Sequence, residues 1–220
     1  MTCLETQSCR FVVLVSGQGS NLRALHQSML AGQTGGSIVG VVSNRPQAQA
    51  LTWAQEQGIS SQTVDHRAFD SREAFDQALS QVIDAFNPDY VLLAGFMRIL
   101  TPAFVNAYLG RLINIHPSLL PDLPGLHTHA RVLESGLKHH GCTVHFVTPE
   151  LDHGPTIAQG RLEVHPYDTV ESLAQRVQKL EHRVYPAVAG WLADGLVSLD
   201  LNHQVCIKHA NTRLFLEILP

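Results

Sequence analysis

FVVLVSGQGSN, residues 11–21, is the segment most indicative of the fold, because an apolar run of strand length passes there directly into a glycine-rich turn. Residues 11–15 are apolar without a break, which is typical of a strand buried on both faces of a parallel sheet. The turn Ser16-Gly17-Gln18-Gly19 follows, and a helix is expected over about 21–30. This order of strand, glycine turn and helix predicts the start of a βαβ unit.

The same order repeats along the chain, so further strands are expected between helices. They cover residues 38–42, 90–94, 112–116, 142–147 and 156–164, the last two as a hairpin-like pair. Pro46 suits the first turn of the helix after the second strand, and Thr101-Pro102 predicts a short helix before strand 112–116. Another short helix is expected between the Pro-rich loop 117–124 and strand 142–147.

Two longer helices carry an N-terminal capping pattern. Asp70 with Glu73 three residues later predicts one helix start, and Asp168 with Glu171 predicts the other. Pro186 should kink the second helix, because proline removes a backbone donor. After about residue 196 apolar residues alternate weakly, which predicts a further strand or two.

The strand and helix order predicts the class of fold. Alternating elements with buried strands favour an α/β fold, a mostly parallel doubly wound sheet with helices on both faces and right-handed crossovers. The weak tail predicts a small C-terminal β extension. The length of 220 residues, with no internal repeat or linker, suits a single domain over residues 1–220.

Composition excludes several classes of protein. A formal charge of −4 with 15 Lys and Arg offers no basic field, so we expect no nucleic acid to bind. No apolar run reaches the roughly 20 residues that span a bilayer, so no membrane partner is expected. The 4 cysteines form no CxxC pair, and the residues before the first strand do not resemble a signal peptide. Reduced thiols in a cytoplasmic protein are therefore predicted.

Asn114, His116 and Asp152 are the residues that point to chemistry. Asn114 and His116 lie two apart in a predicted strand, so their side chains leave the same face of the sheet. Pro117 ends that strand, which places the pair at its carboxyl edge, where ligands bind in open α/β sheets. An amide donor, an imidazole and a carboxylate are the parts needed to transfer an acyl group. The alternative is a satisfied polar pair at a strand end.

Two loops at the same edge have the composition of binding loops. Ser16 to Asn21 offers glycines and helix N-terminal N–H groups to an anion, with a phosphomonoester favoured. It lacks the third glycine of a dinucleotide fingerprint and the Gly-Lys-Ser/Thr of a P-loop, and a simple tight turn is the alternative. Gly95 to Leu100 has apolar residues that suit the wall of a flat aromatic ligand, or alternatively a loop tucked under the next helix.

Histidine is unevenly distributed. Of the 13 histidines, 7 fall between His116 and His153, and His127 and His129 are two apart. The cluster lacks an HExxH motif or Cys/His ligand spacing, so no metal is expected, and histidines on surface loops are the simpler reading.

Eight segments, taken together and in order, resemble the phosphoribosylglycinamide formyltransferase family. They are SGQGSNL (16–22), FDSREAFD (69–76), LLAGFMRIL (92–100), INIHPSLLP (113–121), GLHTH (125–129), VHFV (144–147), LDHGP (151–155) and EHRVYP (181–186). The resemblance implies a Rossmann-like formyltransferase fold. It also implies transfer of a formyl group from 10-formyltetrahydrofolate to the amine of glycinamide ribonucleotide, a step of de novo purine biosynthesis, without a metal.

The resemblance assigns roles by position. His116 would be the catalytic acid, Asn114 would touch the formyl group and the folate, and Asp152 would raise the pKa of His116 above its usual value near 6.5. The remaining assignments concern binding. The ribonucleotide would be held by Gly19, Ser20, Asn21 and Glu181, and the folate by Arg72, Met97, Arg98, Ile99 and Leu100.

Three positions depart from the family pattern. Gln18 stands where Asn is usual, Cys142 where Thr or Ser is usual, and His153 where Gly is usual. Next to Asp152, the His153 ring is expected to narrow the folate loop or to add a titrating group. Residues after about 194 match poorly.

Four other functions are alternatives. A formyltetrahydrofolate hydrolase would carry an additional N-terminal domain and a methionyl-tRNA formyltransferase a C-terminal RNA-binding domain, and neither is expected here. A non-catalytic phosphate- or nucleotide-binding module would bind the ribonucleotide without folate. A zinc hydrolase would use the histidine cluster.

Overall fold

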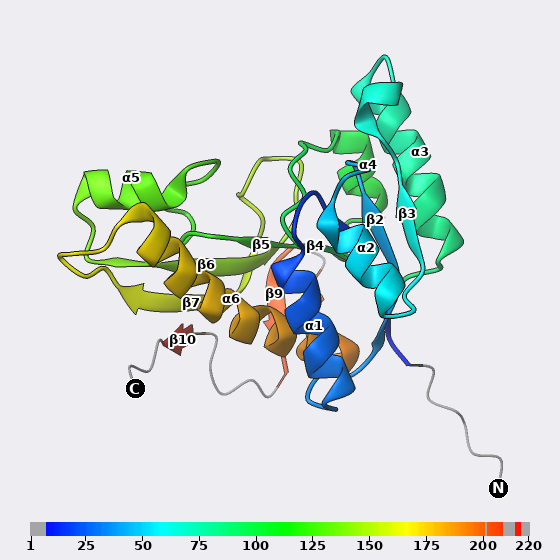
Figure 1. Ribbon diagram of the computed structural model, residues 1–220. Helices are drawn as coiled ribbons and strands as arrows, with labels where there is room; N and C mark the ends of the chain where they lie inside the picture. The colour runs from blue at the N-terminus through cyan, green and yellow to red at the C-terminus, as the bar shows by residue number, and fades with distance from the viewer. Residues whose placement is uncertain (1–7, 201, 209–213, 217–220) are drawn as a thin grey trace, which may run out of the picture.

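A central sheet organises the molecule (Figure 1). The computed structural model describes residues 8–200, 202–208 and 214–216. In this part of the chain the sheet has eight strands in the order β10-β7-β6-β5-β4-β1-β2-β3. They are β1 (Arg10–Val15), β2 (Ser37–Ser43), β3 (Ser61–Thr63), β4 (Tyr90–Leu93), β5 (Leu112–His116), β6 (His139–Phe146), β7 (Thr156–Glu163) and β10 (Leu214–Leu216).

All neighbouring strands are parallel except where β6 is involved. β6 pairs antiparallel with both β5 and β7, so β7 runs in the same direction as β5. β10 is parallel to β7 at the edge of the sheet. Within the described chain β6 is therefore the one reversed strand, and the predicted mostly parallel sheet is confirmed.

Helices cover both faces of the sheet, as predicted. Phe11, Val13 and Val15 of β1 face one core cluster, whereas Val12 and Leu14 face the other, which is why the whole strand is apolar. The first cluster is covered by α1 (Ser20–Leu30), α2 (Gln49–Glu56), α5 (Thr128–Ser135) and α6 (Val170–Ala193). The second is covered by α3 (Arg72–Ala85) and α4 (Pro102–Ala107), and a short 3-10 helix, η1 (His66–Ala68), precedes α3.

The two predicted helix caps are each wrong by one residue. Ser71, not Asp70, is the N-cap of α3, and its hydroxyl accepts the N–H of the third helical residue at 3.0 Å. Thr169, not Asp168, caps α6 in a reciprocal capping box with Ser172. Ser71 and Thr169 have the extended backbone that lets a side-chain oxygen turn back onto the first turn of the helix.

Two proline predictions have different outcomes. Pro46 lies in a turn before α2, which begins at Gln49 with Ala48 as its N-cap, so its placement in the first helical turn is wrong. α6 continues through Pro186, whose carbonyl accepts the Thr34 hydroxyl at 3.0 Å. The kink at Pro186 stays a prediction.

The part of the chain after residue 138 contains more strand than the local sequence patterns predict. β6 begins at His139, three residues earlier than predicted, because His139 pairs with Glu163 of β7. β8 (Val197–Leu199) and β9 (Val205–Ile207) form a separate antiparallel pair, and β10 joins the main sheet. The predicted C-terminal β extension is present in the described residues.

Candidate active site

The carboxyl ends of three adjacent strands carry most of the predicted site residues. β4 lies between β1 and β5, and all three are parallel. The glycine-rich turn follows β1, the Gly95–Leu100 loop follows β4, and Asn114 and His116 end β5. The strand order changes direction between β1 and β4, which is the switch point where ligands bind in open α/β sheets.

Asp152 lies beside His116, although 36 positions separate them in the sequence. One carboxylate oxygen of Asp152 is 3.5 Å from His116 Nδ1, and each side chain is 8% exposed. The same oxygen accepts the Gly125 N–H at 2.8 Å, which fixes the carboxylate from a second loop. Asp152 has φ of 56°, a left-handed conformation that turns the loop sharply at this residue. The loop therefore places the Asp152 carboxylate, which the Gly125 N–H holds in position, next to the His116 imidazole.

Both ring nitrogens of His116 face acceptors. Nε2 lies 3.1 Å from the carbonyl oxygen of Leu123, and Nδ1 faces the Asp152 carboxylate. A carbonyl oxygen has no proton to donate, so His116 Nε2 donates, and a proton on Nδ1 would point at a negative charge. Both ring nitrogens of His116 therefore have an acceptor nearby.

Asn114 has a neighbour that the pattern did not single out. Its amide nitrogen lies 3.2 Å from Nε2 of His145, which pairs with Asn114 across β5 and β6. His145 is buried at 2% exposure, and its Nδ1 donates to the Phe146 carbonyl at 2.9 Å. His145 belongs to the matching segment VHFV, which is one sign of its importance, but the cross-strand register is needed to connect it with Asn114.

The glycine-rich turn presents an uncapped helix start. Gly19 is the N-cap of α1 with φ of 76°, and no side chain caps the helix. A Cβ at Gly19 would lie 2.7 Å from the Ala50 Cβ, so the turn requires glycine on two grounds. The first intrahelical bond runs from Arg23 to Gly19, which leaves the N–H groups of Ser20 and Asn21 for an anion.

Glu181 of α6 joins the start of α1. Asn21 donates from its amide nitrogen to the Glu181 carboxylate at 2.8 Å, and its Oδ1 is buried without a hydrogen-bond partner. Burial raises the pKa of Glu181 to about 7, against the opposing effect of the Asn21 hydrogen bond. Gln178, which the pattern missed, donates to the Ser20 hydroxyl at 3.1 Å. Two separate hydrogen bonds between α1 and α6 thus involve three of the four predicted ribonucleotide residues, next to Gly19.

The loop after β4 is apolar and exposed. The side chains of Met97 and Ile99 are 59% and 57% exposed, which is unusual for large apolar residues. The backbone of Met97 is nevertheless held, because its N–H donates to the Ser16 hydroxyl at 2.7 Å. Arg98 stacks over the Phe75 ring of α3 at 4.8 Å, and Leu100 is half-buried.

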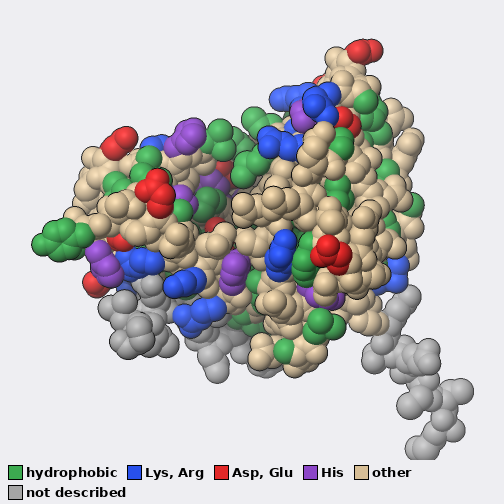
Figure 2. Space-filling model, in the orientation of Figure 1, with side chains coloured by type: hydrophobic (Ala, Val, Ile, Leu, Met, Phe, Trp, Pro, Cys, Tyr) green, Lys and Arg blue, Asp and Glu red, His purple; other side chains and the backbone are tan. Residues whose placement is uncertain are grey.

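Arg72 begins α3 one turn before Phe75 and is exposed. It therefore lies on the helix against which the Arg98 side chain packs. Figure 2 shows hydrophobic, acidic and histidine side chains gathering in the recess between the part that carries α5 and the part that carries α2. Lys and Arg side chains are scattered over this face without forming one basic patch.

His153 turns away from the catalytic pair. Its Nδ1 lies 2.7 Å from the Leu151 carbonyl oxygen and its Nε2 lies 3.8 Å from Glu150. The half-exposed His153 ring therefore lies at the rim of the loop, without a described contact to Asp152, and its effect on the folate loop stays a prediction.

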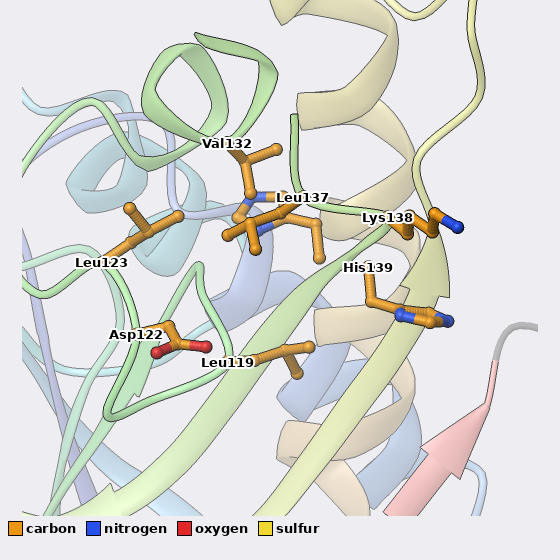
Figure 3. Close-up of a pocket in the computed structure, with 8 residues that line it drawn as sticks. Leu119, Asp122, Leu123, Val132, Leu137, Lys138 and His139 are labelled. Carbon is orange, nitrogen blue, oxygen red and sulfur yellow. The ribbon is translucent and has the colours of Figure 1, made fainter. Parts of the chain in front are cut away.

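Two cavities adjoin the site. One of about 330 Å³ lies beside the glycine-rich turn, and the other of about 170 Å³ lies beneath α5 (Figure 3). Leu123, which lines the second cavity, also supplies the carbonyl that holds His116. The first is lined by Ser16, Gly17, Gln18, Arg45, Gln47, Ala48 and Gln49. The second is lined by Leu119, Asp122, Leu123, Val132, Leu137, Lys138, His139 and His140.

Two histidines of the cluster, His129 and His140, contact each other. His129 Nδ1 and His140 Nε2 lie 3.0 Å apart and share a proton in a hydrogen bond. Burial lowers the pKa of His140 to about 4, and it also lowers the pKa of His129. Within the described residues, no three His, Cys, Asp or Glu side chains converge as metal ligands.

Comparisons with known proteins agree with one another. A family described as formyl transferase matches residues 9–189. Over 191 residues the chain is 50% identical to a phosphoribosylglycinamide formyltransferase of Escherichia coli (strain K12), covering 87% of this chain and 90% of that protein. It is 42% identical to a trifunctional purine biosynthetic protein adenosine-3 of Gallus gallus, of which it spans 20%.

Solved structures show the same likeness. A phosphoribosylglycinamide formyltransferase from Coxiella burnetii superimposes with a TM-score of 0.90 at 43% identity, covering 95% of this chain and 100% of that one. A glycinamide ribonucleotide transformylase from Symbiobacterium toebii gives 0.89 at 39% identity, covering 94% and 97%. None of the described helices is long and apolar enough to cross a membrane.

Proposed function

Since the chain belongs to the phosphoribosylglycinamide formyltransferase family, we propose that Asn114, His116 and Asp152 form its catalytic centre. The family reaction is formyl transfer to glycinamide ribonucleotide in purine biosynthesis. The observation that carries the proposal is the 3.5 Å approach of Asp152 to His116 at the carboxyl edge of β5.

The ribonucleotide binds across the start of α1. Its phosphate accepts the free N–H groups of Ser20 and Asn21, and Gly19 lets the backbone approach it. Glu181 accepts hydrogen bonds from the ribose hydroxyls, since its carboxylate already lies next to Asn21. The buried and unpartnered Oδ1 of Asn21 supports a polar ligand at this position.

The formyl donor is 10-formyltetrahydrofolate, bound at the loop after β4. The exposed side chains of Met97 and Ile99 with Leu100 supply apolar contacts for its ring system, and backbone groups of the loop bond to its edge. Arg98 and Arg72 lie on the α3 side, where a carboxylate of the folate tail would bind. Asn114, on the neighbouring strand, reaches both the folate and the formyl group.

The amine of the ribonucleotide attacks the formyl carbon, forming a new C–N bond. Negative charge develops on the formyl oxygen, and Asn114 with protonated His116 stabilises it. Removing one such donor typically costs about 2.7–4 kcal/mol in barrier height. The bond from carbon to N10 then breaks, and one proton passes from the attacking amine to N10, through His116 or through a water held by Asp152.

The test is to mix 10-formyltetrahydrofolate with the protein and follow its deformylation with and without glycinamide ribonucleotide. We expect deformylation that depends on the ribonucleotide and yields its formylated product. Deformylation without the acceptor would indicate a hydrolase, and ribonucleotide binding without folate binding would indicate a non-catalytic module. A single domain over residues 1–220 and a cytoplasmic location stay predictions.

A further inference from the structure

His145 is joined to Asn114 and to its own strand at the same time. Nε2 of the ring lies 3.2 Å from the Asn114 amide nitrogen, and Nδ1 lies 2.9 Å from the Phe146 carbonyl oxygen. Asn114 and His145 are direct partners in the β5–β6 ladder, so the strand register brings their side chains together. Among the described residues the Asn114 carboxamide has no other protein hydrogen bond.

The Phe146 carbonyl determines where the imidazole proton lies. A carbonyl oxygen only accepts, so Nδ1 of His145 must carry the hydrogen of that bond. In the neutral ring Nε2 is then unprotonated and only accepts. Asn114 must therefore present its NH₂ group, rather than its oxygen, to His145.

The surroundings of the ring favour the neutral form. His145 is 2% exposed, and burial lowers its pKa. Two titratable groups face it: the Asp152 carboxylate favours the charged ring, and protonated His116 on β5 opposes it. A charged ring would donate from Nε2, and the Asn114 carboxamide would have to rotate its oxygen toward β6.

We propose that His145 is a positioning residue that orients the Asn114 carboxamide for the formyl oxygen. With one N–H bound to His145, the second N–H of the Asn114 amide is available to the negative charge that develops during transfer. This inference rests on the proposed catalytic role of Asn114, and it adds a residue of β6, the strand that leads directly into the loop that carries Asp152.

The tautomer of His145 can be measured in the protein without an activity assay. In protein labelled with ¹⁵N at histidine, at pH 7.5, the ring signals of His145 are those that disappear in His145→Gln. We expect the neutral form with the proton on Nδ1. A proton on Nε2, or a doubly protonated ring, would overturn the inference and leave the proposed function untouched.

Matched substitutions test the consequence for catalysis. His145→Gln places an acceptor near the position of Nε2, whereas His145→Asn retains only a donor near the position of Nδ1. Losing a correctly oriented oxyanion donor typically costs about 10²–10³-fold in kcat. We expect that loss in His145→Asn with KM for both substrates unchanged, and recovery of most of kcat in His145→Gln.

The double variant Asn114→Ala/His145→Asn separates the two proposals. If His145 acts through Asn114, the double variant is no slower than Asn114→Ala alone. A further loss of kcat in the double variant, or normal kcat in His145→Asn, would overturn the positioning role. Normal kcat in Asn114→Ala would instead contradict the proposed catalytic centre.

Discussion

Asn21 and Glu181 lie 160 positions apart in the sequence and share a buried hydrogen bond of 2.8 Å. The bond joins the first turn of α1 to the middle of α6, directly beside the glycine turn. Burial of the carboxylate raises the pKa of Glu181 to about 7, so the charged form of this proposed ribose acceptor is held at a cost in stability. A substitution of Glu181 should therefore change stability and ribonucleotide binding in opposite directions.

Glu181→Gln should change the pH dependence of stability. A carboxyl whose pKa is about 7 in the folded state and 4.5 in the unfolded chain stabilises the fold fully below pH 4.5 and loses that contribution as the pH rises to 7. The uncharged amide has no such loss. At pH 8 we expect Glu181→Gln to unfold with a free energy up to about 3 kcal/mol higher than the parent, measured by urea titration.

The same variant should bind the ribonucleotide less tightly, because an amide replaces the carboxylate at the ribose. The control is Glu171→Gln, an exposed glutamate on the same helix. It should change neither the stability profile nor KM. Equal stability of Glu181→Gln and the parent at both pH 4.5 and pH 8 would contradict the raised pKa.

Asp152→Asn should retain the fold and lose turnover. The amide oxygen can still accept the Gly125 N–H, but the negative charge opposite His116 is gone. We expect kcat to fall by about 10²-fold or more, with ribonucleotide affinity by calorimetry unchanged. Asp122→Asn, at an exposed carboxylate of the neighbouring loop, is the matched control and should behave as the parent. Near-normal turnover of Asp152→Asn would show that Asp152 is not part of the catalytic centre.

Arg98→Met should weaken binding of the formyl donor and leave binding of the ribonucleotide unchanged. The methionine retains apolar packing on Phe75 but removes the charge offered to a carboxylate. Losing a hydrogen bond to a charged group costs about 1.5–3 kcal/mol, which corresponds to roughly a 10- to 100-fold higher KM for the formyl donor. The KM for the ribonucleotide should not change.

The control is Arg111→Met, which removes a similar stack, over Tyr108 at 4.7 Å, at the amino end of β5. It should affect neither KM. If both variants raised the KM for the formyl donor equally, the effect would be a general loss of packing rather than loss of a folate contact.

Gly154→Ala should damage the loop that carries Asp152. A Cβ at Gly154 would collide with the Phe146 carbonyl oxygen and lie 3.3 Å from His145 Nδ1. The loop would have to move away from the strand, and we expect a loss of about 1–3 kcal/mol in stability together with lower kcat. Gly190→Ala in α6 meets nothing closer than 3.8 Å and should raise stability by about 0.5–1 kcal/mol. A Gly154→Ala variant with normal melting temperature and kcat would contradict this geometry.

Local patterns predicted most of the elements but not their limits. The five predicted strands after the first are β2, β4, β5, β6 and β7. Of these, β2 and β4 follow short apolar runs that are typical of strands buried on both faces of a sheet. The caps at Ser71 and Thr169 were missed, since adjacent polar residues compete for the same position and backbone angles decide. The early start of β6 depends on its partner β7, which no local pattern contains.

Local sequence patterns are enough to predict the order of most strands and helices, the glycine turn and the polar side chains at the carboxyl edge of the sheet. The contacts of Asp152 with His116, of Glu181 with Asn21 and of His145 with Asn114 become visible only in the folded chain. Local order follows from side-chain period and backbone preference, which act over a few residues. These three contacts depend on strand register and on loop and helix packing between distant segments, which are set by burial of the whole core.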